Sequence, residues 1–321
     1  MKIIQLGVGG WGKNHVRILS ELEFLCGVFD TDMTKSKEYA EKYHVDWFES
    51  IDDIVNYEFD GVVICTPTKT HYDLAKIFLH HKKHVFVEKP LTYSSAQGME
   101  LVNLAKQNNV ILTCGYIERF NPSVIELKKF IESEKYGKLL SLEFHRENRV
   151  PQHINDVGII FDTTVHDIDT ANYLFGANPM TVFAISQKTK HVNEDFVTAI
   201  LGYENNRTAT IISNWVTSSR VRTFRAVFTD GIIHGDFILQ AIRIETKNKI
   251  VTLKNPREEP LLAELKHFAG CIKNKTFPLV TPDEAVMTTQ IAESILSSSQ
   301  KGTLVYIRPK NPILRNQNER C

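Results

Sequence analysis

A short glycine pattern near the start of the chain restricts the possible folds more than any other feature. The residues Gly7-Val8-Gly9-Gly10-Trp11-Gly12 directly follow the apolar run Lys2–Leu6 and precede a helical pattern at Asn14–Leu22. In this pattern the first glycine permits a tight turn, the second lets the backbone approach a pyrophosphate, and the last lets a helix pack closely on a strand. The helix N-terminus attracts the anion. We therefore expect Gly7, Gly9, Gly10, Trp11 and Gly12 to contact a dinucleotide.

The rest of the first third alternates apolar runs with helical patterns. The runs are rich in Val, Ile and Phe without alternation, as in strands buried on both faces. Strands are expected at Phe24–Phe29, Gly61–Cys65, His84–Val87 and Val110–Cys114. Helices are expected at Met33–Tyr43, Tyr72–His80 and Ser94–Gln107. Right-handed crossovers between such strands predict an α/β domain with a doubly wound parallel sheet over residues 1–118.

After residue 118 the pattern changes to strands joined by turn signals. Four runs, at Phe196–Tyr203, Thr208–Val216, Thr223–Thr229 and Ile232–Phe237, predict an antiparallel meander. Helices are expected at Pro122–Glu132, with Asn121 as the N-cap, and at Phe161–Leu174, Leu261–Cys271 and Pro282–Ser297. We expect a second domain over residues 119–309, for substrate binding and oligomerisation, and a polar tail over residues 310–321.

Composition excludes several classes of partner. The 321 residues include 38 Lys and Arg and 38 Asp and Glu, so no basic excess favours nucleic acid or an anionic membrane as partner. No apolar run approaches the roughly 18 residues of a membrane span, and the glycines come too early for a signal peptide. Cys26, Cys65, Cys114, Cys271 and Cys321 are scattered without C-x-x-C spacing, which predicts reduced thiols in the cytoplasm and argues against zinc. A small-molecule ligand is therefore expected.

The residue at the end of the second predicted strand indicates which dinucleotide binds. A carboxylate there, Asp30, hydrogen-bonds the adenosine ribose hydroxyls and repels a 2′-phosphate. This predicts NAD rather than NADP, against the alternative of a glycine turn without ligand and a solvated Asp30. The segments Thr66-Pro67-Thr68-Lys69-Thr70-His71 and Glu88-Lys89-Pro90 follow two further strands, where nucleotide contacts are also expected.

Together the glycine pattern, Thr66-Pro67 with His71, and above all Glu88-Lys89-Pro90 resemble the glucose–fructose oxidoreductase / inositol dehydrogenase family. The resemblance implies an N-terminal Rossmann domain and a C-terminal α/β domain with a large, open, mainly antiparallel sheet. It also implies that Glu88 holds the nicotinamide ribose and that Lys89 contacts both the nicotinamide and the reacting hydroxyl. Thr66, Pro67, Thr68 and His71 would line the dinucleotide.

A polar stretch in an apolar helix is the candidate chemical site. Asp162, His166 and Asp169 are spaced to lie on one helical face. Asp162 would bond one imidazole nitrogen of His166, orient the other toward substrate and stabilise the imidazolium formed when His166 takes a hydroxyl proton. Alternatively, Asp162 is a helix cap and His166 a core residue, or the two bind a metal with His145 or His153.

The spacing of these two residues also resembles the Asp-x-x-x-His of the same family, which acts with the lysine of Glu-Lys-Pro. The resemblance implies Lys89, Asp162 and His166 as the catalytic residues and requires no metal. Oxidation of an alcohol fits this set, because removal of the hydride must be accompanied by removal of the hydroxyl proton.

The substrate is suggested by the segment Gly115-Tyr116-Ile117-Glu118-Arg119-Phe120-Asn121-Pro122. Together with Asp156-Val157-Gly158 it resembles the branch of the family that oxidises the 3-hydroxyl of UDP-N-acetylglucosamine and related nucleotide sugars. Substrate contacts are then implied for Tyr116, Glu118, Arg119 and Asn121, alongside Lys89 and His166. Arg146 and Arg149 are candidates for gripping a diphosphate.

Two other functions remain open from the sequence. One is a dehydrogenase of a free sugar or a cyclitol. The other is an NAD-binding regulator without turnover, against which the intact Lys89, Asp162 and His166 count, because a sensor has no use for a proton acceptor. A structural interpretation also stays open: the segment Gly115–Pro122 would be a linker that ends in a helix cap, and Arg146 and Arg149 would be ordinary surface arginines.

The second domain also suggests self-association. On the run Thr208–Val216, Ala209, Ile211 and Trp215 alternate with Ile212 and Val216, so apolar residues point to both faces of the sheet. A helix layer covers only one face. The other face is expected to pack on a second subunit, which predicts a homodimer or homotetramer.

Overall fold

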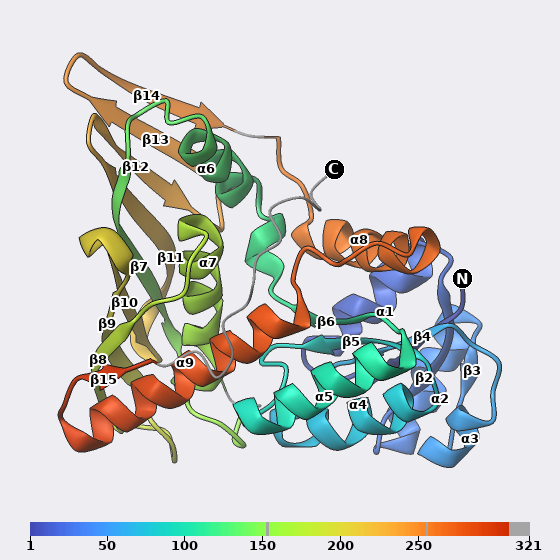
Figure 1. Ribbon diagram of the computed structural model, residues 1–321. Coiled ribbons are helices and arrows are strands. Elements are labelled where there is room, and N and C mark those ends of the chain that lie inside the picture. The colour runs from blue at the N-terminus through green and yellow to red at the C-terminus, as the bar shows by residue number, and fades with distance from the viewer. Residues whose placement is uncertain (152–153, 255, 308–321) are drawn as a thin grey trace.

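The computed structural model describes residues 1–151, 154–254 and 256–307 and contains two β-sheets that lie side by side (Figure 1). The predicted polar tail 310–321 and His153 lie outside the described residues. The division of the chain at residue 118 stays a prediction, although the two sheets do separate near this point of the chain.

The N-terminal sheet has six parallel strands in the order β3-β2-β1-β4-β5-β6. The strands are β1 (Ile3–Leu6), β2 (Leu25–Phe29), β3 (Asp46–Trp47), β4 (Gly61–Ile64), β5 (His84–Glu88) and β6 (Leu112–Gly115). The helices between them are α1 (Gly12–Glu21), α2 (Met33–Tyr43), α3 (Ile51–Val55), α4 (His71–His80) and α5 (Ser95–Asn108). The predicted doubly wound sheet is confirmed; the short β3 and α3 were not expected. The strand order reverses between β1 and β4, where such sheets bind dinucleotides.

The second sheet has nine strands in the order β14-β13-β12-β11-β7-β10-β9-β8-β15. They are β7 (Leu139–Arg149), β8 (Thr181–Gln187), β9 (Phe196–Gly202), β10 (Thr208–Asn214), β11 (Val216–Phe228), β12 (Gly231–Asp236), β13 (Ala241–Thr246), β14 (Lys249–Lys254) and β15 (Val305–Tyr306). Its pairings are antiparallel except for β10 with β7. The expected large, mainly antiparallel sheet is confirmed.

The predicted simple meander is wrong at one place. Strand β7, which comes earlier in the chain, lies between β10 and β11 and pairs with both. The chain turns sharply after β10, because Asn214 Oδ1 accepts hydrogen bonds from the backbone N–H groups of Val216 and Thr217, at 3.2 and 3.1 Å. This turn leads the chain across the end of β7 instead of into a hairpin.

Four helices complete the fold: α6 (Pro122–Glu132), α7 (Val165–Phe175), α8 (Pro260–Asn274) and α9 (Pro282–Lys301). Helices α6, α7 and α9 cover one face of the second sheet (Figure 1), and α9 also packs on α5. Helix α8 packs on α1 and on the 3₁₀ turn Ile117–Phe120. Among the described residues no helix is long and apolar enough to cross a membrane.

The helix predicted at Phe161–Leu174 is not uniform. A π-helical turn, Ile160–Thr164, leads into α7, which ends where Gly176 takes a left-handed conformation with φ of 62°. Asp162 lies in the π-helical turn and His166 in the first turn of α7. The change in helical period between them alters which way their side chains point, and π-helical turns are frequent at functional sites.

Candidate active site

The glycine turn and Asp30 meet at the carboxyl ends of β1 and β2. Gly7 has φ of +80°, and a side chain on it would collide with the backbone of Cys65, so glycine is required there. A side chain on Gly9 would have no neighbour within 4 Å, so Gly9 borders the open space where a pyrophosphate can approach. Asp30 Oδ2 accepts from the N–H of Val8 at 2.9 Å, which holds this carboxylate beside the turn. This arrangement fits NAD.

The segment after β4 is tied to the segment after β5 by His71. Its two ring nitrogens lie 2.8 Å from the carbonyl oxygen of Pro90 and 2.9 Å from that of Thr66. Burial is the main cause that lowers the pKa of His71, so the ring is neutral near pH 7 and donates to one carbonyl at a time. His71 therefore supports the backbone of both segments, rather than pointing its polar atoms at the cofactor. Thr66, Pro67 and Thr68 are not buried and border the same edge of the sheet.

Glu88 has a partner that the sequence did not suggest. His15, on the buried face of α1, bonds Glu88 Oε1 through Nε2 at 2.9 Å, and the N–H of Lys89 donates to Oε2 at 3.0 Å. Burial alone would raise the pKa of Glu88, but the bond and charge of His15 and the charge of Lys89 together lower it. The polar histidine among Val16, Ile18 and other apolar residues of the helix was the available signal.

One group of metal-ligating side chains occurs in the described part of the chain: His15, Cys65 and Glu88, whose ligand atoms lie within 4.8 Å of one another. His15 and Glu88 are hydrogen-bonded to each other, and burial raises the pKa of the Cys65 thiol well above its usual value. A protonated thiol is a poor ligand. The version of the alternative metal site that uses His145 is not assembled, because His145 lies on the opposite face of the second sheet from the buried Arg146 and Phe144. His153, the other histidine considered for it, lies outside the described residues.

Lys89 and Asp162 meet across the two domains. Lys89 Nζ donates to Asp162 Oδ1 at 2.8 Å and to the backbone oxygen of Asp162 at 2.6 Å. Asp162 Oδ2 accepts from the Thr163 hydroxyl at 2.9 Å, and that hydroxyl accepts from Trp215 Nε1 at 3.1 Å. Thr163 and Trp215 were not among the expected site residues. Their bonds give Asp162 donors at both carboxylate oxygens, which stabilises its ionised form.

His166 lies beside this pair and is partly buried. Its Nδ1 is buried without a hydrogen-bond partner within the described residues, and its Nε2 is not among the buried atoms. Burial first, and then the charges of Lys89, Arg146 and Arg222, lower the pKa of His166 well below its usual value. The imidazole is therefore neutral near pH 7 and able to accept a proton. The ring of Tyr116 packs edge-on against it, with centroids 6.5 Å apart.

The hydrogen bond expected between Asp162 and His166 is not formed in this structure. Nδ1 of His166 has no hydrogen-bond partner in the described part of the chain, whereas the carboxylate of Asp162 accepts from Lys89 and Thr163. The physical reason is the π-helical turn, which breaks the regular i, i+4 spacing assumed for the two residues. In this structure Asp162 thus orients Lys89, and not the imidazole.

The arginine of β7 is committed to buried partners. Arg146 is only 3% exposed, donates from Nε and Nη2 to Asp167 at 2.8 to 3.2 Å, and donates from Nη1 to Glu118 at 3.0 Å. Asn121 donates to Glu118 Oε2 at 3.1 Å and caps α6 by accepting from Ser123. In this structure Arg146, Glu118 and Asn121 are therefore engaged with one another and with Asp167. Their expected contacts with a substrate stay predictions.

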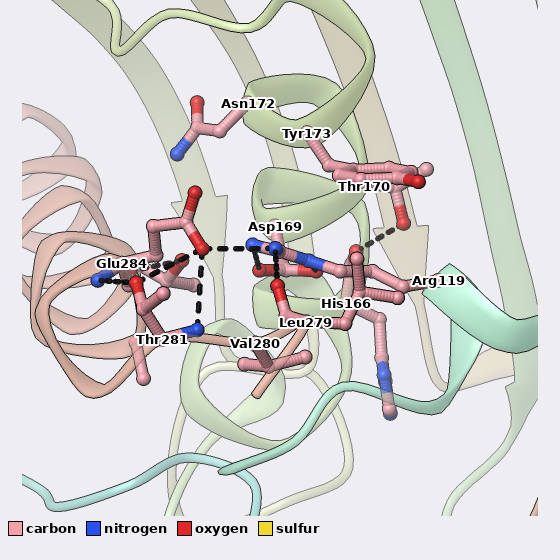
Figure 2. Close-up of polar contacts among 12 residues, drawn as sticks. Arg119, His166, Asp169, Thr170, Asn172, Tyr173, Leu279, Val280, Thr281 and Glu284 are labelled. Atoms are coloured by element: carbon pink, nitrogen blue, oxygen red, sulfur yellow. Dashed lines mark hydrogen bonds and ion pairs between the residues drawn. The ribbon is translucent and has the colours of Figure 1, made fainter. Parts of the chain in front are cut away.

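Arg119 makes a second buried network (Figure 2). It forms a bidentate pair with Asp169, at 2.9 and 2.6 Å, and its Nη1 donates to Glu284 and to the backbone oxygen of Leu279. These contacts join the interdomain segment to α7 and α9. In Figure 2 the His166 side chain leaves α7 in a different direction from Asp169. Asp169 therefore points away from the candidate active site. Arg119 connects α7 to α9 through its bonds to Asp169 and Glu284. Arg149, exposed at the end of β7, donates only to the Ser218 carbonyl among the described residues, at 3.2 Å.

Comparison with known proteins identifies the family. Residues 1–116 match the profile of an oxidoreductase family with an NAD-binding Rossmann fold, and residues 124–234 match that of the GFO/IDH/MocA C-terminal domain. The chain belongs to this family of NAD-binding oxidoreductases, as its sequence motifs suggested. The cofactor is NAD.

Relatives in this family act on sugars and polyols. A UDP-N-acetylglucosamine 3-dehydrogenase of Acidithiobacillus ferrooxidans is 27% identical over 74% of this chain and 75% of its own. A scyllo-inositol 2-dehydrogenase (NAD(+)) of Bacillus subtilis is 27% identical over 95% of this chain and 96% of its own. The solved structure of UDP-N-acetylglucosamine 3-dehydrogenase GnnA from A. ferrooxidans covers 94% of this chain and 98% of its own, with a TM-score of 0.87 at 24% identity.

An oxidoreductase from Agrobacterium radiobacter, solved in complex with NAD+, L-tartaric acid and magnesium, has a TM-score of 0.88 at 17% identity. It covers 95% of this chain and 98% of its own. At these identities the structural likeness establishes the fold alone. The family match establishes an NAD-binding oxidoreductase whose relatives are sugar and polyol dehydrogenases.

Proposed function

We propose that this protein oxidises the 3-hydroxyl of a UDP-N-acetylhexosamine to a ketone with NAD. The observation that carries the proposal is the Lys89–Asp162 ion pair beside the neutral His166, at the edge of the Rossmann sheet where the cofactor binds. A cation held by a carboxylate next to an uncharged imidazole is what removal of a hydroxyl proton requires.

The three side chains have separate tasks in this proposal. NAD, when bound, accepts the hydride from the carbon that carries the hydroxyl. His166 accepts the hydroxyl proton at Nε2. Lys89 has two of its three N–H groups engaged by Asp162, so the third donates to the substrate oxygen and stabilises the negative charge that develops there. Asp162 keeps the ammonium group in place.

The proposal of a nucleotide sugar as substrate rests on similarity to other members of the family. The segment Tyr116–Pro122 resembles the nucleotide-sugar branch of the family, and a UDP-N-acetylglucosamine 3-dehydrogenase matches the chain over three quarters of its length. The second candidate is a cyclitol dehydrogenase, because an inositol dehydrogenase matches over nearly the whole chain. Most of the residues of that segment are occupied by structural contacts, so direct assay must decide between the two.

The assay incubates the protein and NAD with UDP-N-acetylglucosamine, UDP-N-acetylgalactosamine, myo-inositol or scyllo-inositol. NADH fluorescence reports oxidation, and mass spectrometry reports a product that has lost two hydrogen atoms. We expect NADH and a keto product only with a UDP-sugar. Oxidation of an inositol without oxidation of either UDP-sugar would replace the proposal by the cyclitol alternative. No NADH with any of the four would contradict both.

We also propose that the protein works in the cytoplasm as a homodimer or homotetramer formed through the second sheet. The uncovered face of this sheet carries apolar side chains at Ile185 and Ile200, which are 56% and 48% exposed. Apolar side chains gathered on one open face favour burial against another subunit. The reduced cysteines expected from their scattered spacing suit the cytoplasm.

A further inference from the structure

Arg222 on β11 points to the same side of the second sheet as the active-site helix. Phe224 and Ala226, two and four residues further along the strand, are buried on the helix-covered face, and side chains two residues apart share a face. In the ladder between the two strands, Arg222 lies opposite Arg146 of β7. Two arginines directly opposite each other on neighbouring strands repel and destabilise the sheet, so we ask what the second arginine binds.

The two arginines differ in their partners. Arg146 is bonded to Asp167 and Glu118. The guanidinium of Arg222 forms no hydrogen bond or ion pair with any side chain or backbone group in the part of the chain that the structure describes. Burial first, and then the charges of Arg146 and Arg220, lower the pKa of Arg222 to about 10, and the more favourable charges of Glu118 and Asp167 do not compensate. A partly buried, unpaired guanidinium opposes folding.

Arg222 is also close to the proton acceptor. Its positive charge, like those of Lys89 and Arg146, acts on His166. Of these three cations, Lys89 is paired with Asp162 and Arg146 with two carboxylates, which leaves Arg222 uncompensated. A substrate whose hydroxyl lies at His166 therefore has an unpaired guanidinium within electrostatic range.

We propose that Arg222 binds an anionic group of the substrate, a phosphoryl or a carboxylate close to the carbon that is oxidised. The inference rests on the dehydrogenase site proposed above and adds to it the charge of the substrate. On a hexose oxidised at carbon 3, a phosphoryl on carbon 1 or a carboxylate at carbon 6 is close enough to share the site, and a guanidinium fork suits either group. A neutral cyclitol has no such group. Arg222 thus takes the role that the sequence suggested for Arg146.

The test measures binding, so that it does not depend on turnover. The NADH-loaded protein is titrated in a calorimeter with four ligands: UDP-N-acetylglucosamine, its 6-carboxylate, N-acetylglucosamine 1-phosphate and myo-inositol. Wild type is compared with Arg222→Gln, with Arg222→Lys and with Arg207→Gln as the matched control. Arg207 lies in the turn between β9 and β10 and bonds the backbone oxygens of Glu204 and Phe175, away from the site.

We expect at least one anionic ligand to bind wild type and to lose affinity about 10- to 100-fold in Arg222→Gln, with a smaller loss in Arg222→Lys and none in Arg207→Gln. A loss that appears with the 1-phosphate identifies the phosphoryl group; a loss confined to the 6-carboxylate identifies that group. The melting temperature of Arg222→Gln should not fall, because no partner is removed.

Two results would overturn the proposal. One is that no anionic ligand binds wild type, and the other is that such a ligand binds Arg222→Gln as tightly as wild type. If the dehydrogenase site is correct and only the anion subsite is wrong, wild type and Arg222→Gln will oxidise the same substrate, a UDP-sugar or an inositol, at equal rates. If the dehydrogenase site itself is wrong, neither protein will produce NADH with any of these substrates. The two failures are therefore distinguishable.

Discussion

The indole N–H of Trp215 sets the direction of a chain of polar groups that ends at Lys89. An indole nitrogen only donates, so the Thr163 hydroxyl accepts from Trp215 and directs its own hydrogen to Asp162 Oδ2. Asp162 then accepts from Lys89 through Oδ1. Thr163 is a positioning residue in this account, because it acts on Lys89 only through Asp162.

Replacing Thr163 tests this role. In Thr163→Val the hydroxyl is lost, Asp162 Oδ2 loses a donor, and we expect kcat to fall about 10-fold, equivalent to about 1.4 kcal/mol, with little change in KM. Thr163→Ser keeps the hydroxyl and should restore most of kcat. Steady-state kinetics of both variants decide the matter: a Thr163→Val protein that keeps wild-type kcat, with a loss in Thr163→Ser, would show that the methyl group and not the hydroxyl is needed.

The sequence predicted which residues form the candidate active site better than it predicted which of them are bonded to one another. Lys89, Asp162 and His166 were expected from family-like motifs, and the structure brings them to one edge of the Rossmann sheet. The pairing of Lys89 with Asp162 was not expected, since the two are 73 residues apart and meet only when the domains are in place. The helical spacing suggested Asp162–His166 instead, because periodicity contains no information about a π-helical turn.

Among the elements, helix α8 was predicted from the sequence, but it carries one charged residue, Glu264, at a buried position. Glu264 is 3% exposed, and neither of its carboxylate oxygens has a hydrogen-bond partner in the described structure. It faces a small cavity lined in part by Phe86, Phe120 and Phe268. Burial raises the pKa of Glu264 well above its usual value, so the side chain is protonated in the folded protein at a pH where it ionises in the unfolded chain.

Glu264→Leu should therefore stabilise the protein, by about 1–3 kcal/mol near neutral pH, because an unsatisfied buried polar group is replaced by an apolar one. A group whose pKa is raised on folding contributes its stability below the unfolded value of about 4.3 and loses it as the pH rises toward the folded value. The gain over wild type should thus grow between about pH 5 and pH 8. Denaturant unfolding at both pH values measures it, with Lys266→Leu, an exposed change on the same helix, as control. A gain that shrinks with pH would contradict the assignment.

For the whole molecule, the two sheets differed in how far they could be predicted. The Rossmann sheet was predictable because its order follows from successive local crossovers, each marked by an apolar run and a helix. The second sheet was not, because β7 inserts between two strands that come some sixty residues later in the chain. The expected alternation of buried and open faces holds: Ala209 and Ile211 are buried, and Ile212 on the other face is only partly buried.

This open face makes the assembly testable. Changing Ile185 and Ile200 together to Asp places charges on the face proposed to pack against a second subunit, and we expect a dimer or tetramer to become a monomer in light scattering at micromolar concentration. Phe277→Asp is the control, because Phe277 is 80% exposed but lies between α8 and α9, away from the sheet. A wild-type monomer, or an assembly that survives the double change, would contradict the proposed interface.

The most direct test of the account is the effect of His166→Ala on turnover, NAD affinity and melting temperature in the same preparation. With UDP-N-acetylglucosamine as substrate we expect kcat to fall by about 10²–10⁴, the range for loss of a general base, while NAD affinity stays unchanged. The exposed His80→Ala should behave as wild type. The lowered pKa of His166 also predicts that wild-type kcat/KM falls only at acidic pH, and this acid limb should disappear in the variant. Near-normal turnover by a folded His166→Ala protein would contradict the catalytic assignment.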